Sequence, residues 1–137
     1  MIAPLPENEL ARPNVLRQYE ILDTAPEQGY DELVTLAAQI CQTPIAWMSL
    51  VAPLRQWFKA KVGVTVCETS RDIAFCAHTI LQRAILEIQD ATADPRFADN
   101  PLVTQDPFIS FYAGIPLVTS KGYALGAFCV IDSVPGN

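Results

Sequence analysis

The sequence predicts an α+β domain in which helices cover an antiparallel sheet of about five strands. Two helical patterns come first, strand-like segments in hairpin spacing follow, and a further helical pattern lies among them. The 137 residues match the usual size of one domain and are enough to bury a core. We therefore expect a single domain over residues 1–137, with a helical lead at about 8–22 and a core at about 24–132.

The first two helices are expected before residue 43. Residues 9–19 read as helical, with a start near Pro13 because proline is tolerated in a first turn. The stretch Thr24-Ala25-Pro26-Glu27 has the form of a capping box and predicts a helix over 25–42. Its apolar residues recur at helical spacing: Tyr30, Leu33, Val34, Ala37, Ile40 and Cys41.

The first hairpin is predicted directly after this helix. IAWMSLV (45–51) and QWFKAKV (56–62) are rich in β-branched and aromatic residues, and a short turn separates them. Gly63 is expected to end the second strand.

The remaining strands are predicted in the second half of the chain. AILEIQDA (84–91) alternates as a strand does, and ISFYAGIPLV (109–118) and YALGAFCVID (123–132) flank a turn. The stretch at about 90–108, between the first and second of these three strands, is rich in Asp, Pro and Asn and has little periodicity. Long irregular connections inside compact domains are uncommon and tend to be functional.

The segment ETSRDIAFCAHTIL holds the chain's single histidine, two residues after a cysteine. Ile73, Cys76, Ala77, Ile80 and Leu81 fall on one helical stripe, which predicts a buried Cys76.

Cys76 and His78 cannot form a thiol–imidazole pair within such a helix. Helical residues two apart point about 200° apart around the axis. His78 is therefore expected beside Phe75 and Gln82, away from the apolar stripe. Cys76 is read as an apolar filler, while a reactive thiol favoured by the helix N-terminus stays open as an alternative.

The composition excludes several classes of partner. Fifteen acidic against nine basic residues give a net charge of −6, and the basic residues form no run that could neutralise phosphates. No segment approaches the length of a membrane span, and the first residues do not resemble a secretory signal. We expect a cytoplasmic protein that binds neither nucleic acid nor membranes.

Metal binding and enzymatic chemistry are not expected from the motifs. The four cysteines form no C-x-x-C pair, and the aspartates of the 90–106 region lack the spacing of a calcium loop. The cysteines read as free thiols, most of them buried. Motifs of acyl transfer, phosphate binding and zinc hydrolysis are missing, so the sequence predicts that the chain itself is not an enzyme.

The order of several long blocks resembles the GAF sensory domains of bacterial, especially cyanobacterial-type, signalling proteins. The resemblance runs from about Leu10 to Asp132. The blocks that carry it are ILDTAPEQGYDELVTLAAQIC, PIAWMSLV, RQWFKAKVG, ETSRDIAFCAHTIL, DATADPRFADNPLV and FYAGIPLVTSKGYALGAFCVID.

The family implies a central antiparallel sheet with helices mainly on one face and a small-molecule pocket on the other. Such domains are common in sensor histidine kinases and diguanylate cyclases of two-component and related signalling systems. The interval in which relatives carry bilin-attaching or catalytic cysteines reads ADPRFADNPLVTQDPFIS here, so no covalent bilin is expected and the cofactor stays unknown.

This chain departs from the family at two places. Ala52 stands where an acid is usual after the first strand, which affects a turn or pocket contact. The helix that normally follows the last strand is absent, which suggests a piece of a longer signalling protein whose output domain is attached.

The resemblance predicts a non-catalytic sensory domain that binds a small ligand or a partner protein and controls an attached output module. A thiol redox sensor or reductase using Cys76 or Cys67, and a ligand-free dimerisation module, are the alternatives. A homodimer is possible. The residues predicted to line the ligand pocket are Trp57, Arg71, Phe75, His78, Asp90, Phe97 and Tyr112.

Overall fold

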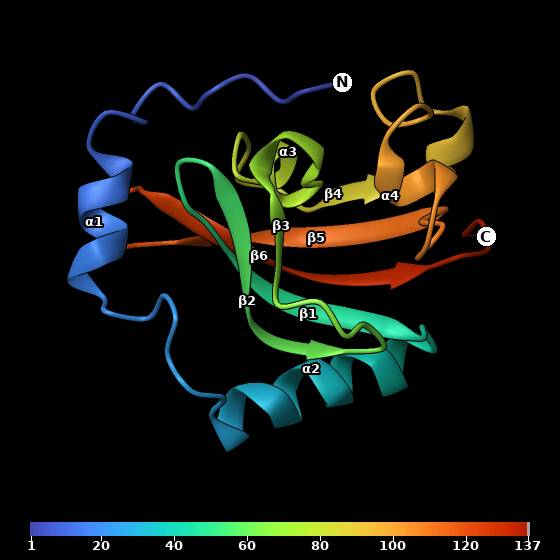
Figure 1. Cartoon of the computed structure of the whole chain (residues 1–137), viewed down its shortest axis with the longest axis horizontal. Coiled ribbons are helices and arrows are strands. Elements are labelled where there is room, and N and C mark those ends of the chain that lie inside the picture. Colours follow the sequence, from blue (N-terminus) through green and yellow to red (C-terminus); the bar gives the residue numbers. More distant parts are fainter. Residues whose placement is uncertain (137) are drawn as a thin grey trace.

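A computed structural model describes residues 1–136, and its centre is a six-stranded sheet, seen in Figure 1. The strand order is β3-β2-β1-β6-β5-β4, and neighbouring strands are antiparallel. The strands are β1 (Ile45–Val51), β2 (Arg55–Val62), β3 (Glu68–Ser70), β4 (Leu86–Ile88), β5 (Phe111–Val118) and β6 (Ala124–Asp132). The predicted α+β class is confirmed, and the extra strand is β3, a short edge strand whose polar sequence gave no strand signal.

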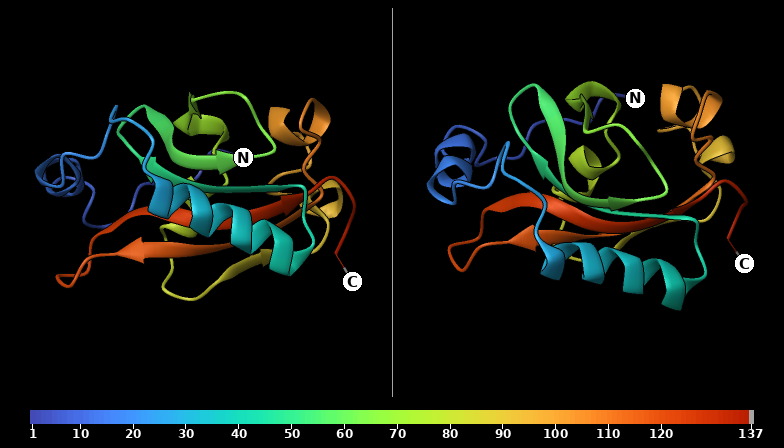
Figure 2. Two further views of the ribbon diagram at one scale, coloured as in Figure 1. Left: turned by 90° about the horizontal axis from the view of Figure 1, so that it is seen from below. Right: turned by 60° about the horizontal axis from the view of Figure 1, so that its bottom comes forward.

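The longest helix covers one face of the sheet, and short helical segments lie on the other (Figure 2). The helices are α1 (Arg12–Gln18), α2 (Gln28–Cys41), α3 (Cys76–Thr79) and α4 (Pro101–Thr104), with 3₁₀ turns η1 (Arg71–Ile73) and η2 (Ala91–Ala93). Side chains alternate along β1, so Trp47 and Val51 face α3 and α4 while Ala46 and Met48 face α2. All seven residues of β1 are buried because both faces are covered.

The second helix begins later than the capping-box pattern predicted. Its N-cap is Glu27, and no side chain caps it. The ammonium group of Lys59 instead binds the Thr24 hydroxyl and the Ala25 carbonyl, each at 2.7 Å, and the Glu27 carboxylate at 2.7 Å. A buried cation with three acceptors thus ties residues 24–27 to β2, and the backbone of Glu27 is extended.

The stripe predicted for the second helix is only partly buried. Val34 and Ala38 pack on the sheet, whereas Leu33, Ile40 and Cys41 are exposed. Of the four cysteines, Cys76 and Cys129 are buried and Cys41 and Cys67 are exposed, so the prediction that most are buried is wrong.

The predicted helix around Cys76 is a single turn. The segment starts as η1, becomes extended at Ala74, and forms α3 over only four residues. Cys76 is fully buried as expected, whereas Leu81 is 39% exposed. The His78 side chain, expected away from the buried stripe, is only 7% exposed because other parts of the chain cover it.

The long polar connection is more ordered than its composition suggested. Asp90 caps η2 by accepting from the Thr92 backbone N–H, and Asn100 caps α4 by accepting from the Leu102 N–H at 2.8 Å. The Asn100 amide also donates to the Ile73 carbonyl at 3.0 Å, which ties α4 to η1. Within residues 1–136, no helix is long and apolar enough to cross a membrane.

Candidate functional site

Four of the predicted pocket residues meet between the sheet and the α3–α4 side. The Phe75 ring stacks on the Phe97 ring, with their centroids 4.3 Å apart. The centroid of the Tyr112 ring lies 5.2 Å from that of Phe75. His78 meets the Phe97 ring edge-on at 4.6 Å. We call Phe75, His78, Phe97 and Tyr112 the aromatic cluster. Its three carbocyclic rings have no exposed surface, so side chains fill this space.

His78 connects the aromatic cluster to the first residues of the chain. Its Nε2 atom lies 3.1 Å from the Met1 carbonyl oxygen, so the tautomer with a proton on Nε2 donates this bond. Burial is the main cause that lowers the pKa of His78 below its ordinary value. The Cys76 sulfur lies against Trp47 and against Tyr112 of the aromatic cluster.

The other three predicted residues lie apart from the aromatic cluster. Trp57 packs with Leu16, Leu50, Ala52 and Leu125 beneath α1. Arg71 forms an ion pair with Glu9, and Asp90 serves as the cap of η2. Among residues 1–136, no three potential metal-ligating side chains of His, Cys, Asp or Glu gather in one place.

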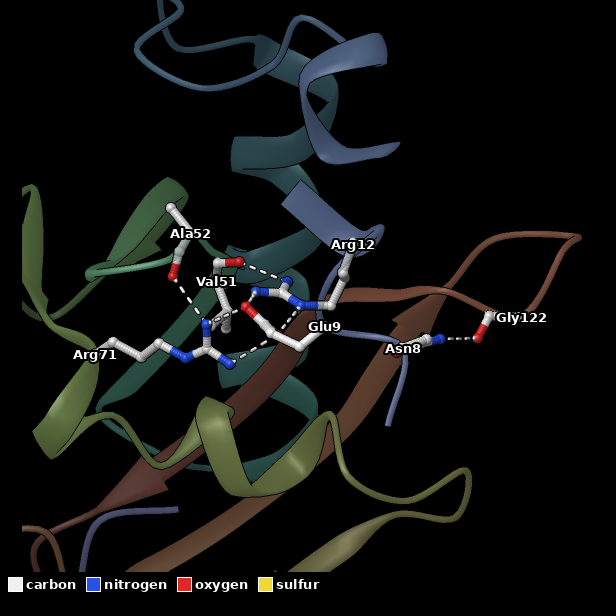
Figure 3. Close-up of polar contacts among 7 residues, drawn as sticks. All are labelled: Asn8, Glu9, Arg12, Val51, Ala52, Arg71 and Gly122. Atoms are coloured by element: carbon white, nitrogen blue, oxygen red, sulfur yellow. Dashed lines mark hydrogen bonds and ion pairs between the residues drawn. The ribbon is translucent and has the colours of Figure 1, made fainter. Parts of the chain in front are cut away.

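A buried ion network, which the sequence did not reveal, fixes the N-terminal segment, residues 1–11 (Figure 3). The Glu9 carboxylate accepts from Arg12 at 2.8 Å and from Arg71 at 2.8 and 3.0 Å. Arg12 also donates to the Val51 carbonyl at 2.6 Å, and Arg71 reaches the Ala52 carbonyl at 3.4 Å. The network therefore joins the start of α1, the end of β1 and η1.

The network strongly favours the charged form of Glu9. Burial acts to raise the pKa of this carboxyl, but the hydrogen bonds and charges of Arg71 and Arg12 outweigh burial and lower the pKa to about 2. Arg12 has no exposed surface and Arg71 is 7% exposed. The spacing of Glu9 and Arg12 was a local signal for this pair, but Arg71 is 62 residues away from Glu9 and gave none.

The N-terminal segment, residues 1–11, runs from α1 past α3 toward the α4 side (Figure 1). Asn8 donates to the Gly122 carbonyl at 3.4 Å, and Arg83 donates to the same oxygen at 2.7 Å. A hollow of about 460 Å³ lies between this segment and the end of α3, lined by residues that include Leu5, Pro6 and Leu81. This volume lies within the usual range for small-molecule sites.

The chain is similar to one characterised enzyme over nearly its whole length. No family model matches the chain. It is 43% identical over 132 residues to a cyclic di-GMP phosphodiesterase of Pseudomonas aeruginosa, and the match covers 96% of this chain but 22% of that protein. The chain thus spans about a fifth of the relative's length.

This match contradicts the prediction that the chain is not an enzyme, because the relative is named for an enzymatic activity. The prediction rested on missing catalytic motifs, and this sequence corresponds to only 22% of the relative.

Solved structures agree on the fold at low sequence identity. The GAF domain of an Acinetobacter phosphoenolpyruvate-protein phosphotransferase is 17% identical, with a TM-score of 0.62 over 90% of this chain and 78% of that one. The corresponding domain from Coxiella burnetii is 14% identical, with a TM-score of 0.63 over 93% and 81%. A type II free methionine-R-sulfoxide reductase from Thermoplasma acidophilum is 12% identical, with a TM-score of 0.63 over 88% and 79%. The chain therefore has the fold of GAF domains.

Proposed function

We propose that the chain is a sensory domain that regulates cyclic di-GMP hydrolysis in a larger phosphodiesterase. The observation that carries this proposal is the 43% identity to a cyclic di-GMP phosphodiesterase over 96% of the chain, which is 22% of that relative. The fold supports it, because the chain has the fold of GAF domains and one solved structure of this fold is a domain of a two-component sensor histidine kinase protein. The relative favours a phosphodiesterase over the histidine kinase or diguanylate cyclase that the sequence suggested.

The sensory site of this proposal lies between the sheet and the α3–α4 side. The aromatic cluster supplies flat apolar surfaces, and His78 supplies a polar group with a lowered pKa. In the structure the space is closed, with Phe75 and Phe97 stacked on each other. A ligand that separates these rings would bind an open conformation better than the closed one. Such a difference in affinity is what shifts the equilibrium between the closed and open conformations.

Mass spectrometry of the purified chain tests the sensory site. We expect the native mass to exceed the chain mass, and we expect the excess to disappear on denaturation because the ligand is bound non-covalently. Phe97→Leu should reduce the retained ligand, since it removes a ring from the aromatic cluster at a modest cost in packing. Phe108→Leu is the matched control, because Phe108 is 55% exposed.

Two results would contradict the proposed site. One is a native mass equal to the chain mass. The other is a ligand that Phe97→Leu and Phe108→Leu retain to the same extent.

A further inference from the structure

Two thiols from distant parts of the sequence meet in the core below α3. Cys129 lies in β6, where its cross-strand partners are Trp47 of β1 and Gly114 of β5. The Cys76 sulfur is 3.5 Å from the Trp47 indole nitrogen and 3.5 Å from the Tyr112 hydroxyl.

The Tyr112 hydroxyl lies against the backbone of Gly114, where an added Cβ would come within 2.3 Å of it. The groups that contact the Cys76 sulfur therefore flank Cys129 on both sides. This placement puts the two thiols next to each other, and both are buried.

The surroundings give the two thiols different acidities. Burial acts to raise the pKa of Cys76, but the polar side chains around it, Cys129, Ser49, Trp47 and Tyr112, outweigh burial and lower the pKa to about 7. Burial and the neighbouring Cys76 raise the pKa of Cys129 well above its ordinary value. The Ser49 hydroxyl has no hydrogen-bond partner among residues 1–136.

This difference in pKa between the two thiols suits a pair of cysteines that reacts with a peroxide. The Cys76 thiol ionises near neutral pH and can act as a nucleophile. The Cys129 thiol stays protonated at this pH.

We propose that Cys76 and Cys129 are a redox-active pair that a hydroperoxide converts to an intramolecular disulfide. The Cys76 thiolate attacks the terminal oxygen of the hydroperoxide, the O–O bond breaks, and the leaving oxygen takes a proton to become an alcohol, or water for hydrogen peroxide. The Cys129 sulfur then attacks the resulting Cys76 sulfenic acid, and the expelled hydroxide leaves as water with the Cys129 proton. In total, two thiols and one hydroperoxide give a disulfide, an alcohol and a water.

The disulfide would change how α3 is held. α3 is a single turn that carries both Cys76 and His78, and His78 contacts the N-terminal segment through the Met1 carbonyl. A covalent bond from Cys76 to β6 would fix this turn to the sheet and remove the thiolate that Trp47 and Tyr112 contact. Because both sulfurs are buried, the peroxide reaches them through a local opening of the core.

Peptide mapping of the full chain tests this pair. The starting protein carries Cys41→Ser and Cys67→Ser, which remove the two exposed thiols and leave the core intact. After treatment with hydrogen peroxide, we expect the folded protein to lose the mass of two hydrogen atoms and to yield a Cys76–Cys129 linked peptide that dithiothreitol cleaves. The oxidation rate should increase as the pH rises through about 7, because the fraction of Cys76 thiolate increases.

A third substitution tests the order of the steps. With Cys129→Ser added, a sulfenic acid should accumulate at Cys76 and react with dimedone, provided that circular dichroism shows an unchanged fold. The proposal is overturned if the intact pair stays reduced in the folded protein while the urea-unfolded chain is oxidised by the same peroxide. This assay involves no cyclic di-GMP, so its result is independent of the proposed phosphodiesterase role.

Discussion

Replacing Glu9 with glutamine should lower the free energy of unfolding by about 3–5 kcal/mol, the usual cost of removing one partner from a buried ion pair. The guanidinium groups of Arg12 and Arg71 would stay buried without a counter-charge. Urea unfolding at pH 7 measures the change. Glu7→Gln is the matched control, since Glu7 is exposed and forms none of these contacts.

The pH dependence of the free energy of unfolding distinguishes the charge interactions of this ion network from apolar packing. The lowered pKa of Glu9 in the folded chain, about 2 against 4.5, corresponds to about 3 kcal/mol of stability. A carboxyl with a lowered folded pKa stabilises fully above 4.5, and this stability is lost as the pH falls toward 2. The stability difference between wild type and Glu9→Gln should therefore shrink over that range. A difference below about 1 kcal/mol at pH 7 would contradict the role given to the network.

Replacing Phe75 with alanine should lower the free energy of unfolding by about 3–5 kcal/mol, the range for removing a large aromatic side chain from a core. Phe75 has no exposed surface, and its ring contacts both Phe97 and Tyr112. The loss combines the transfer of the ring to water on unfolding with the cavity left between the sheet and the α3–α4 side. Thermal and urea unfolding of the purified chain measure it.

Phe108→Ala is the control for the Phe75 substitution. Phe108 is 55% exposed. Its φ is positive, at 57°, and alanine is strained in this conformation as phenylalanine is, so the substitution does not change the backbone strain. We expect a change well below that of Phe75→Ala. Equal losses from the two substitutions would show that the aromatic cluster is not part of the folded core.

The strands were predictable because their signal is local. In β1, β2, β5 and β6, β-branched and aromatic residues lie in short runs that turns separate, and the structure places strands there. The short edge strand β3 was missed because its sequence is only three polar residues. Thr24 shows the opposite error, since the side chain of a strand residue, Lys59, overrides its local capping pattern.

The site was only partly predictable because it depends on long-range contacts. Phe75, Phe97 and Tyr112 are large apolar residues whose burial follows from composition, and the structure brings them together. The placement of Trp57 under α1, and of Arg71 beside Glu9, depends on where the N-terminal segment folds back. The approach of Cys76 to Cys129 likewise depends on how α3 packs on β6, a long-range contact that local sequence patterns do not predict.

A chimera tests most directly whether this domain regulates cyclic di-GMP hydrolysis, as proposed above. The corresponding segment of the Pseudomonas aeruginosa phosphodiesterase is replaced by this chain, and its hydrolysis of cyclic di-GMP is compared with that of the same enzyme lacking the segment. Coupling between a sensory site and a catalytic site is typically about 5- to 150-fold.

We predict that loss of the segment changes the hydrolysis rate by a factor in that range, and that this chain restores most of the original rate. Phe97→Leu in the chimera should move the rate toward that of the enzyme lacking the segment, whereas Phe108→Leu should leave it unchanged. Equal rates with and without the segment would contradict the account.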